Sequence, residues 1–115
     1  MRFSALVAIL ADELEEPAID SAKAAGAGGV TILSGRGIGT REKKTIFGLT
    51  YEGSQSVLIF VLERKLSVKV LKKMTRDLEL DSHSKGVVFT LPLEHITGMD
   101  MSQLERFESQ LRDEL

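Results

Sequence analysis

Apolar residues gather in four short runs along the chain, at residues 3–10, 30–33, 57–62 and 87–91. A nearly continuous apolar run of this length is more typical of a buried strand than of a helix. The run at 57–62, VLIFVL, shows no alternation of polar and apolar positions. The pattern therefore predicts four strands, in a sheet that has to be covered on both faces.

Helical periodicity follows the first and the third of these runs. After the first run, acidic residues lead to Pro17, which is typical of a helix start because the helix dipole favours negative charge there. Gly26 and the glycines after it end this helix. After the third run, apolar residues repeat at every fourth position and predict a helix over residues 66–79. The repeating residues are Leu66, Val70, Met74 and Leu78.

The order of these elements is β-α-β, a long loop, and a second β-α-β. It predicts an α+β fold of the ferredoxin-like class, a βαββαβ split sandwich with both helices on one face of the sheet. The other face is also apolar, so it has to be buried elsewhere. Packing three sheets around an axis would bury it and would create ligand clefts between subunits. We therefore expect a homotrimer.

Residues 100–115 lie beyond this domain, whose extent we predict as residues 1–99. A capping box formed by Ser102 and Glu105, together with an apolar stripe at helical spacing, predicts an extra C-terminal helix. The stripe consists of Met101, Leu104, Phe107 and Leu111. We expect this helix to pack on its own sheet or on a neighbouring subunit, with docking to another protein as the alternative.

Composition and charge narrow the possible functions. A length of 115 residues fits one domain, and 15 basic against 17 acidic residues do not favour nucleic acid as a partner. The chain has no cysteine, which excludes disulfides and thiolate metal sites and suits a cytoplasmic protein. The sequence shows neither a signal peptide nor a run of about 20 apolar residues, so we expect no insertion into a membrane.

Three glycines, Gly35, Gly37 and Gly39, occupy every other position after the second apolar run. Side chains alternate along a strand, so all three would leave the same face bare. Backbone N–H groups exposed there could meet a ligand, and Arg36 adds donors suited to phosphate. The alternative interpretation is structural, with glycines that let the strand bend and hinge the loop beyond it. The spacing matches neither the dinucleotide-binding fingerprint nor the P-loop.

The loop after these glycines, residues 38–55 in its widest extent, mixes cationic and bulky apolar side chains. Residues 40–54 show neither the helical nor the strand period, and long irregular loops in small domains are usually functional or disordered. A docking loop for a partner protein is one interpretation, because binding hot spots favour aromatic and arginine side chains. The alternative is that residues 46–51 extend a hairpin with the glycine strand. The candidate contact residues are Arg41, Lys43, Lys44, Phe47, Leu49 and Tyr51.

Three segments, VTILSGRGIG, VLIFVL and KGVVFTLPL, resemble the PII signal-transduction proteins in order and spacing over about residues 3–99. The strand that leads into the flexible T-loop of that family reads V-T-x-x-x-G-x-G, and Val30, Thr31, Gly35 and Gly37 stand at those places. The resemblance implies a cytoplasmic homotrimer that binds an adenine nucleotide (AMP, ADP or ATP) between subunits. It also implies that residues 38–55 act as a T-loop and contact a target protein, plausibly a membrane permease.

By this resemblance, the effector-binding residues are Thr31, Gly35, Arg36, Gly37, Gly39, Lys85 and Gly86. Several positions depart from the family pattern. Ile38 and Gly39 replace an Arg-Gln pair, and the phosphate-binding loop keeps only Lys85 and Gly86 as an approximate counterpart. The basic pair that follows the last strand in the family is absent. Charge-assisted contacts to phosphate contribute about 1.5–3 kcal/mol each, so a nucleotide with fewer phosphates, or a small anion, becomes comparatively more plausible.

Three other function classes are less well supported by the sequence. Adjacent residues on a turn, such as Ser82, His83 and Ser84, do not form a catalytic triad, and we expect no catalytic residues. RNA binding would require stacking aromatics and a basic face, which the chain lacks. Divalent-metal binding by His83 and His95 remains the alternative to nucleotide sensing. We predict a PII-like regulator whose effector orders or releases the loop.

Overall fold

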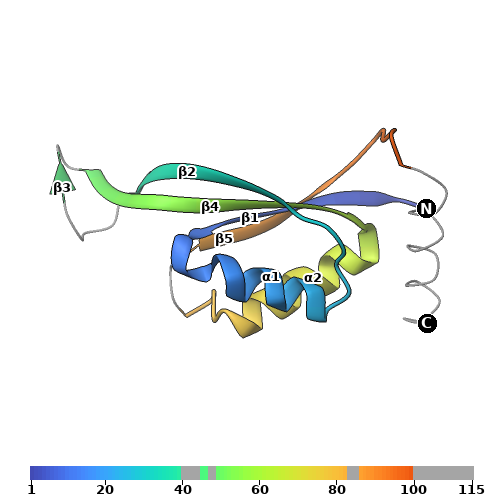
Figure 1. The fold of residues 1–115 in the computed structure, drawn as a ribbon, viewed down its shortest axis with the longest axis horizontal. Helices are drawn as coiled ribbons and strands as arrows, with labels where there is room; N and C mark the ends of the chain where they lie inside the picture. The colour runs from blue at the N-terminus through green and yellow to red at the C-terminus, as the bar shows by residue number, and fades with distance from the viewer. Residues whose placement is uncertain (40–44, 47–48, 83–85, 100–115) are drawn as a thin grey trace.

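The computed structural model describes residues 1–39, 45–46, 49–82 and 86–99. Figure 1 shows two layers, an antiparallel sheet on one side and two helices that pack beneath it. Both helices cover the same face of the sheet, and the opposite face carries no helix from the described residues. This arrangement confirms the predicted ferredoxin-like fold of the α+β class.

The described residues form the following elements: β1 (Phe3–Ala11), η1 (Asp12–Leu14), α1 (Glu15–Ala24), β2 (Thr31–Gly39), β3 (Thr45–Ile46), β4 (Leu49–Glu63), α2 (Arg64–Asp77) and β5 (Gly86–Pro92). The strand order is β2-β4-β1-β5, with the short β3 paired to β4. All four pairings are antiparallel. β1 and β4 are the central strands, and β2 and β5 lie at the edges.

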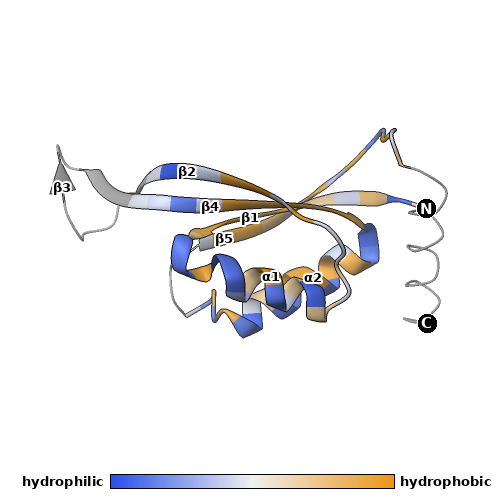
Figure 2. Cartoon of the chain, in the orientation of Figure 1, coloured by the Kyte–Doolittle hydropathy of each residue, from blue (hydrophilic) through white to orange (hydrophobic). Residues whose placement is uncertain are grey.

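The core lies between the sheet and the helices. Alternate residues of β1 and β4 point into it, and among the largest fully buried side chains are Leu6, Leu58 and Phe60. From α2, Val70 and Met74 meet them at the helical spacing that the sequence predicts. Figure 2 shows the same division, with apolar residues along the strands and polar residues on the outer surfaces of the helices.

The second helix begins at a cap made by a buried carboxylate. Glu63, the last residue of β4, accepts hydrogen bonds from the backbone N–H of Lys65 at 2.8 Å and of Leu66 at 3.0 Å. These two N–H groups lie in the first turn, where no helical carbonyl can reach them. One side chain therefore ends the strand and starts the helix without an intervening loop.

The two helices are joined at one point by Asp77. The Ser21 hydroxyl of α1 donates to Asp77 Oδ2 at 2.8 Å, and Lys73 Nζ lies 2.8 Å from the same oxygen. The hydrogen bond from Lys73, followed by that from Ser21, lowers the pKa of the Asp77 carboxyl below its usual value. This contact fixes how α1 and α2 lie against each other.

The glycine strand and its partner extend further than predicted. Residues 49–54 are part of β4 and pair with β2 up to Gly39, so the expectation that all of 40–54 is irregular is wrong there. The hairpin interpretation holds for this stretch. The register shifts between Gly37 and Ile38, opposite Gly53, which has a φ of 77° that glycine adopts without strain. The sequence suggested a loop because residues 40–54 show neither the helical nor the strand period, whereas backbone pairing between β2 and β4 maintains the strand there.

The predicted C-terminal helix at residues 100–115 lies outside the described residues, as do residues 40–44 and 47–48 of the predicted loop.

Candidate effector-binding face

The glycine strand presents two different faces. Pairing with β4 places Leu33 opposite Val57 and Gly35 opposite Gln55, and these positions alternate with the core residues of β4. Thr31, Gly35 and Gly37 therefore lie on the sheet face that points away from the helices. Arg36, between the glycines, emerges on the opposite face, so its side chain and the bare backbone of the glycines do not share a surface.

The two glycines on this face differ in what surrounds them. A Cβ atom added to Gly35 would meet only Val57 Cγ2, at 3.8 Å, which is an ordinary contact. A Cβ on Gly37 would lie 2.5 Å from the carboxamide oxygen of Gln55. The backbone at Gly35 is thus open, whereas the flexible side chain of Gln55 covers Gly37.

Large apolar side chains continue the glycine face across the sheet. Five of them, on strands β2, β4 and β5, are 36–52% exposed: Leu33, Val61, Val87, Phe89 and Leu91. Exposed apolar patches of this kind on a soluble domain usually mark an interaction site. We call this surface, with Thr31, Gly35 and Gly37, the open face. It agrees with the prediction that the second face of the sheet is apolar.

Gly86 has a structural reason to be glycine that the sequence did not reveal. It pairs with Leu10, and a Cβ on it would lie 2.6 Å from the Ile9 carbonyl oxygen and 2.5 Å from Leu10 Cδ2. The backbone of β1 cannot give way as a side chain can. The close approach of β5 to β1 at this point therefore requires glycine, whether or not a ligand is present.

Gly86 and the glycine strand lie at opposite edges of the sheet. Gly86 is paired with Leu10, Leu10 with Ser56, and Ser56 with Ser34, so the four residues form one row across β5, β1, β4 and β2. Three strand spacings separate the ends of this row by about 14 Å. Within a single chain, the predicted effector residues on β2 and at Gly86 therefore do not form one compact pocket.

The other predicted residues are only partly covered by the structure. Gly39 ends β2, and Leu49 and Tyr51 belong to β4, where Tyr51 pairs with Ile38. Four cationic or aromatic candidates lie outside the described residues: Arg41, Lys43, Lys44 and Phe47. Lys85, the predicted source of positive charge, also lies outside them. The predicted roles of these residues stay predictions.

The alternative metal site is not assembled in the described part of the chain. His95 and Glu94 are exposed after β5, and His83 lies outside the described residues. Within residues 1–39, 45–46, 49–82 and 86–99, no group of three or more His, Asp or Glu side chains could hold a metal ion. Metal binding by His83 and His95 remains a prediction.

A buried serine of β4, on the face covered by the helices, was missed by sequence reasoning. The Ser56 hydroxyl lies 2.9 Å from Asp12 Oδ1 and 2.8 Å from Glu15 Oε1. A hydroxyl has one proton, so it can donate to only one carboxylate at a time. The acidic run was interpreted as a helix start, and both residues do begin η1 and α1. Asp12 and Glu15 have a further role that the acidic run did not indicate. They anchor the beginning of η1 and α1 to Ser56 of β4.

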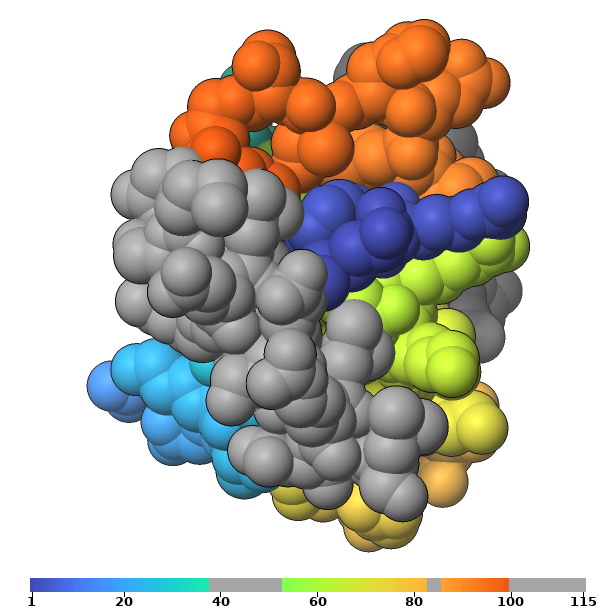
Figure 3. All heavy atoms as spheres, turned by 90° about the vertical axis from the view of Figure 1, so that its right-hand side faces the viewer, coloured from blue at the N-terminus to red at the C-terminus, as the bar shows by residue number. Residues whose placement is uncertain are grey.

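Two hollows lie away from the open face. One, of about 460 Å³, lies between the N-terminus, the start of α2 and the chain that leaves β5. Its lining includes Arg2, Phe3, Arg64, Leu93 and Ile96. Figure 3 shows these segments side by side, with the N-terminal residues in dark blue between residues 86–99 in orange and the start of α2 in green. The other hollow, of about 420 Å³, lies on α2.

The sheet topology, the glycine strand at one edge and the long hairpin beyond it define a ferredoxin-like domain with one exposed, apolar sheet face. The sequence model of the family "Nitrogen regulatory protein P-II" matches residues 3–100. The chain belongs to this family, as the resemblance in its strands and glycines indicated. No curated protein matches the sequence.

Solved structures with the same fold include PII-like proteins. The chain is similar to CPII from Thiomonas intermedia K12 bound to ADP and bicarbonate, with 26% identity, a TM-score of 0.57, and 81% of this chain and 87% of that chain covered. It is also similar to the GlnK-ATP complex of B. subtilis, at 13% identity and a TM-score of 0.63, over 81% and 84% of the two chains. At 13% identity, this second likeness shows the fold alone.

A third neighbour carries the same fold with a different description. The periplasmic divalent cation tolerance protein CutA from Archaeoglobus fulgidus is 12% identical, with a TM-score of 0.65 over 96% of this chain and 99% of that chain. None of the helices in the described residues is long and apolar enough to cross a membrane.

Proposed function

We propose that this protein is a PII-like signalling regulator, not an enzyme. In the proposed mechanism it assembles as a trimer through the open face, binds an adenine nucleotide between subunits, and controls a target protein through residues 38–55. The observation that carries this proposal is the open face itself. It combines exposed apolar side chains with a bare stretch of backbone at Gly35.

Assembly follows from the exposed apolar area. Phe89, Leu91 and Val61 would be costly to leave in water, at roughly 25 cal/mol for each Å² of apolar surface. Closed symmetric oligomers bury such a face by repeating the same contact around an axis. Three copies around an axis would also bring the β2 edge of one chain toward the β5 edge of the next. The separation of Gly35 and Gly86 within one chain would then no longer prevent a shared site.

Nucleotide binding is supported by the relatives and by the shape of β2. CPII has been solved with ADP and bicarbonate, and with ADP and AMP, while GlnK has been solved with ATP. In this chain, the base or ribose would lie on the apolar open face near Gly35. Phosphates would be met by Lys85 and Gly86. Few further cations are available for this role, so we propose AMP or ADP in preference to ATP.

Control of a target follows from the hairpin. Effector binding at the base of β2 would change the equilibrium between two arrangements of residues 38–55, by no more than the difference in effector affinity for the two. The target-contacting residues in this proposal are Arg41, Lys43, Lys44, Phe47, Leu49 and Tyr51. A membrane permease is the proposed class of target, and a cytoplasmic location is part of the same proposal.

The experiment is calorimetric titration of AMP, ADP and ATP into the wild type and Gly35→Leu, with light scattering on both. A leucine at position 35 has room on its own chain, so it should fold normally and project into the proposed cleft. Gly29→Leu is the matched control, because a Cβ at Gly29 meets nothing within 4 Å and the residue lies before β2. We expect at least about a tenfold loss of nucleotide affinity in Gly35→Leu alone.

Two outcomes would contradict the proposal. A monomer mass for the wild type at micromolar concentration would remove the trimer and its clefts. Equal nucleotide affinity for Gly35→Leu and the wild type would show that the glycine strand is not the binding site. The same titration with zinc and copper tests the alternative, in which His83 and His95 bind a divalent metal.

A further inference from the structure

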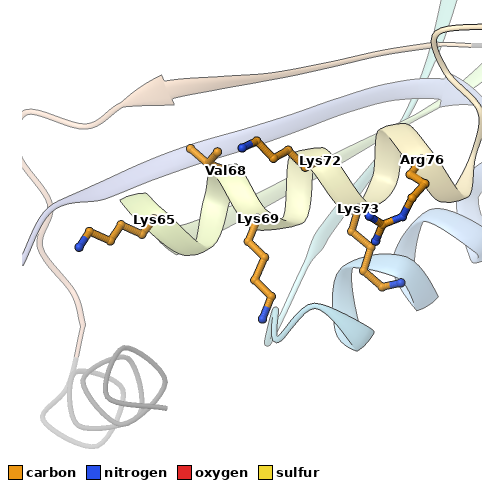
Figure 4. A pocket seen from close by; sticks show the side chains of 6 residues that line it. All are labelled: Lys65, Val68, Lys69, Lys72, Lys73 and Arg76. Atoms are coloured by element: carbon orange, nitrogen blue, oxygen red, sulfur yellow. The ribbon is translucent and has the colours of Figure 1, made fainter. Parts of the chain in front are cut away.

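The exposed side of α2 carries a concentrated positive charge that the proposed regulator function does not use. α2 holds six of the 15 basic residues of the chain and one of its 17 acidic residues. Five of the six line the hollow of about 420 Å³ on this helix: Lys65, Lys69, Lys72, Lys73 and Arg76. Figure 4 shows these side chains and Val68, all projecting from α2.

Helical geometry places these five cations together. At 3.6 residues per turn, they fall within an arc of roughly 100°, beside the stripe of buried residues Leu66, Val70 and Met74. Lys65 and Lys72 are exposed, whereas Lys73 and Arg76 both lie next to the single carboxylate of the helix, Asp77, at 2.8 Å and 4.0 Å. We call this surface the cationic face. Bringing so many like charges together is unfavourable unless an anionic group lies against them.

The apolar side of α2 is already occupied by the core, so the helix cannot turn to insert into a lipid surface. Val68, 44% exposed, is the one apolar residue that lines the hollow. A partner for this face therefore has to supply mainly negative charge over the length of α2, with at most a small apolar contact. Lys65 and Arg76 are eleven residues apart, which corresponds to about 17 Å along the helix.

One segment of this chain has the required charge. Residues 100–115 contain five acidic residues and two basic ones. The acidic residues are Asp100, Glu105, Glu108, Asp113 and Glu114. The cationic face and this acidic segment are thus complementary in sign, within a chain whose net charge is only −2.

The residues that precede the acidic segment lie close to the first residue of α2. The Leu93 N–H donates to the Phe3 carbonyl at 3.0 Å, and the Arg64 N–H donates to the Arg2 carbonyl at 2.9 Å. Ile96 and Arg64 line the same hollow, so the chain passes the first residue of α2 only four residues before position 100. Sixteen residues span up to about 50 Å when extended, which is ample for a helix of 14 residues. The tether makes the local concentration of the segment high.

From this placement we propose that the cationic face of α2 is the docking surface for the acidic segment 100–115 of the same chain. The segment neutralises Lys65 and Lys72 through exposed ion pairs. It is displaced when salt screens these pairs or when a stronger polyanion competes.

Lysine acetylation of the full-length protein, read by mass spectrometry at 20 mM and 500 mM salt, tests the proposal. The comparison variant has the five acidic residues of the segment changed to Asn or Gln. At low salt, Lys65 and Lys72 should react about tenfold more slowly in the wild type than in this variant. At high salt, this difference should disappear. Lys23, exposed in the last turn of α1, is the internal control and should react equally in both proteins.

Carbodiimide cross-linking of a mixture of ¹⁴N- and ¹⁵N-labelled wild-type protein identifies the occupant. Cross-links from Lys65 or Lys72 to residues 100–115 within one isotopic form support the proposal. Cross-links that join the two isotopic forms would overturn it in favour of a neighbouring copy. Equal acetylation of wild type and variant would also overturn it, as would protection that develops only when phosphatidylserine vesicles are added.

A reverse-charge variant gives a second measurement. Lys65→Glu/Lys72→Glu should release the segment, so its acidic residues lose their cross-links to Lys69 and Lys73, the two lysines of the hollow that the variant keeps. Because both lysines are exposed, the fold should be retained, and circular dichroism checks this. A folded variant that keeps the wild-type cross-links at Lys69 and Lys73 contradicts the proposal.

Discussion

The two faces of the sheet are built from alternate residues of the same strands, yet they have opposite environments. On the covered face, Leu58 and Phe60 are at most 1% exposed beneath α1 and α2. On the open face, Val61 and Phe89 are equally apolar and remain exposed. In the part of the chain that the structure describes, helices cover only one face. The comparison shows that apolar strands without alternation indicate a need for cover, and do not show whether that cover comes from the same chain.

The largest expected effect is on the free energy of unfolding, and it distinguishes the two faces when one phenylalanine on each is replaced by alanine. Phe60→Ala on the covered face should destabilise folding by about 3–5 kcal/mol, because it leaves a cavity between sheet and helices. Phe89→Ala should change the unfolding of the isolated chain much less, and should instead weaken association. Urea unfolding gives the first quantity and light scattering the second. Similar losses of stability in both variants would contradict the distinction.

The next effect concerns the β5 edge, where the backbone is most closely packed. Gly86→Val should cost about 1–3 kcal/mol or more, because its Cβ would press on the Ile9 carbonyl oxygen. Gly35→Val, at the β2 edge, should stay within about 0.5 kcal/mol of the wild type, since its Cβ has room. Thermal unfolding measures both. A tolerated valine at position 86 would show that β5 can shift away from β1.

A smaller effect is expected where the covered face meets its helix. Glu63→Ala removes the acceptor for the Lys65 and Leu66 N–H groups and should cost about 1 kcal/mol. Glu63→Asp, which keeps a carboxylate on a shorter side chain, should recover part of this loss. Urea denaturation of the three proteins compares them directly. An alanine variant as stable as the wild type would show that water replaces the cap.

The smallest effect concerns pH. Hydrogen bonds from Lys73 and Ser21 lower the pKa of Asp77 in the folded protein, so its contribution to stability is present above the pKa of the unfolded chain. That contribution is lost as the pH falls through the lower pKa of the folded state. Asp77→Asn should therefore lower Tm slightly at pH 7, and the difference should shrink in acid. Melting curves from pH 7 to pH 2 test this, with Ser21→Ala as a milder variant.

Much of the fold was predictable because burial leaves a clear pattern in the sequence. The VLIFVL run and the four-residue repeat from Leu66 to Leu78 identified the central strand and the second helix. The extended hairpin was only the alternative interpretation, because residues 40–54 show neither the helical nor the strand period, and backbone pairing between β2 and β4 forms the strand in spite of this.

The candidate site was less predictable than the fold. Sequence spacing indicated a bare stretch at the glycines, and the structure places Gly35 and Gly37 on one face. It did not indicate that Arg36 emerges on the other face, that Gln55 covers Gly37, or that Gly86 lies across the sheet. These depend on contacts between strands far apart in the chain. The sequence analysis did not single out the cations of α2, and the structure shows that five of them line one hollow.

The pairing of β4 has a mechanical consequence. β1 ends at Ala11, opposite Gln55, whereas β4 continues back to Leu49 with β2 beside it. Beyond Gln55, the two strands form a narrow ribbon that protrudes past the helices (Figure 1). At about 3.3 Å per residue, this ribbon is a lever arm of about 20 Å. A rotation of this ribbon by a few degrees about Gln55 would therefore move its far end by roughly an ångström or more.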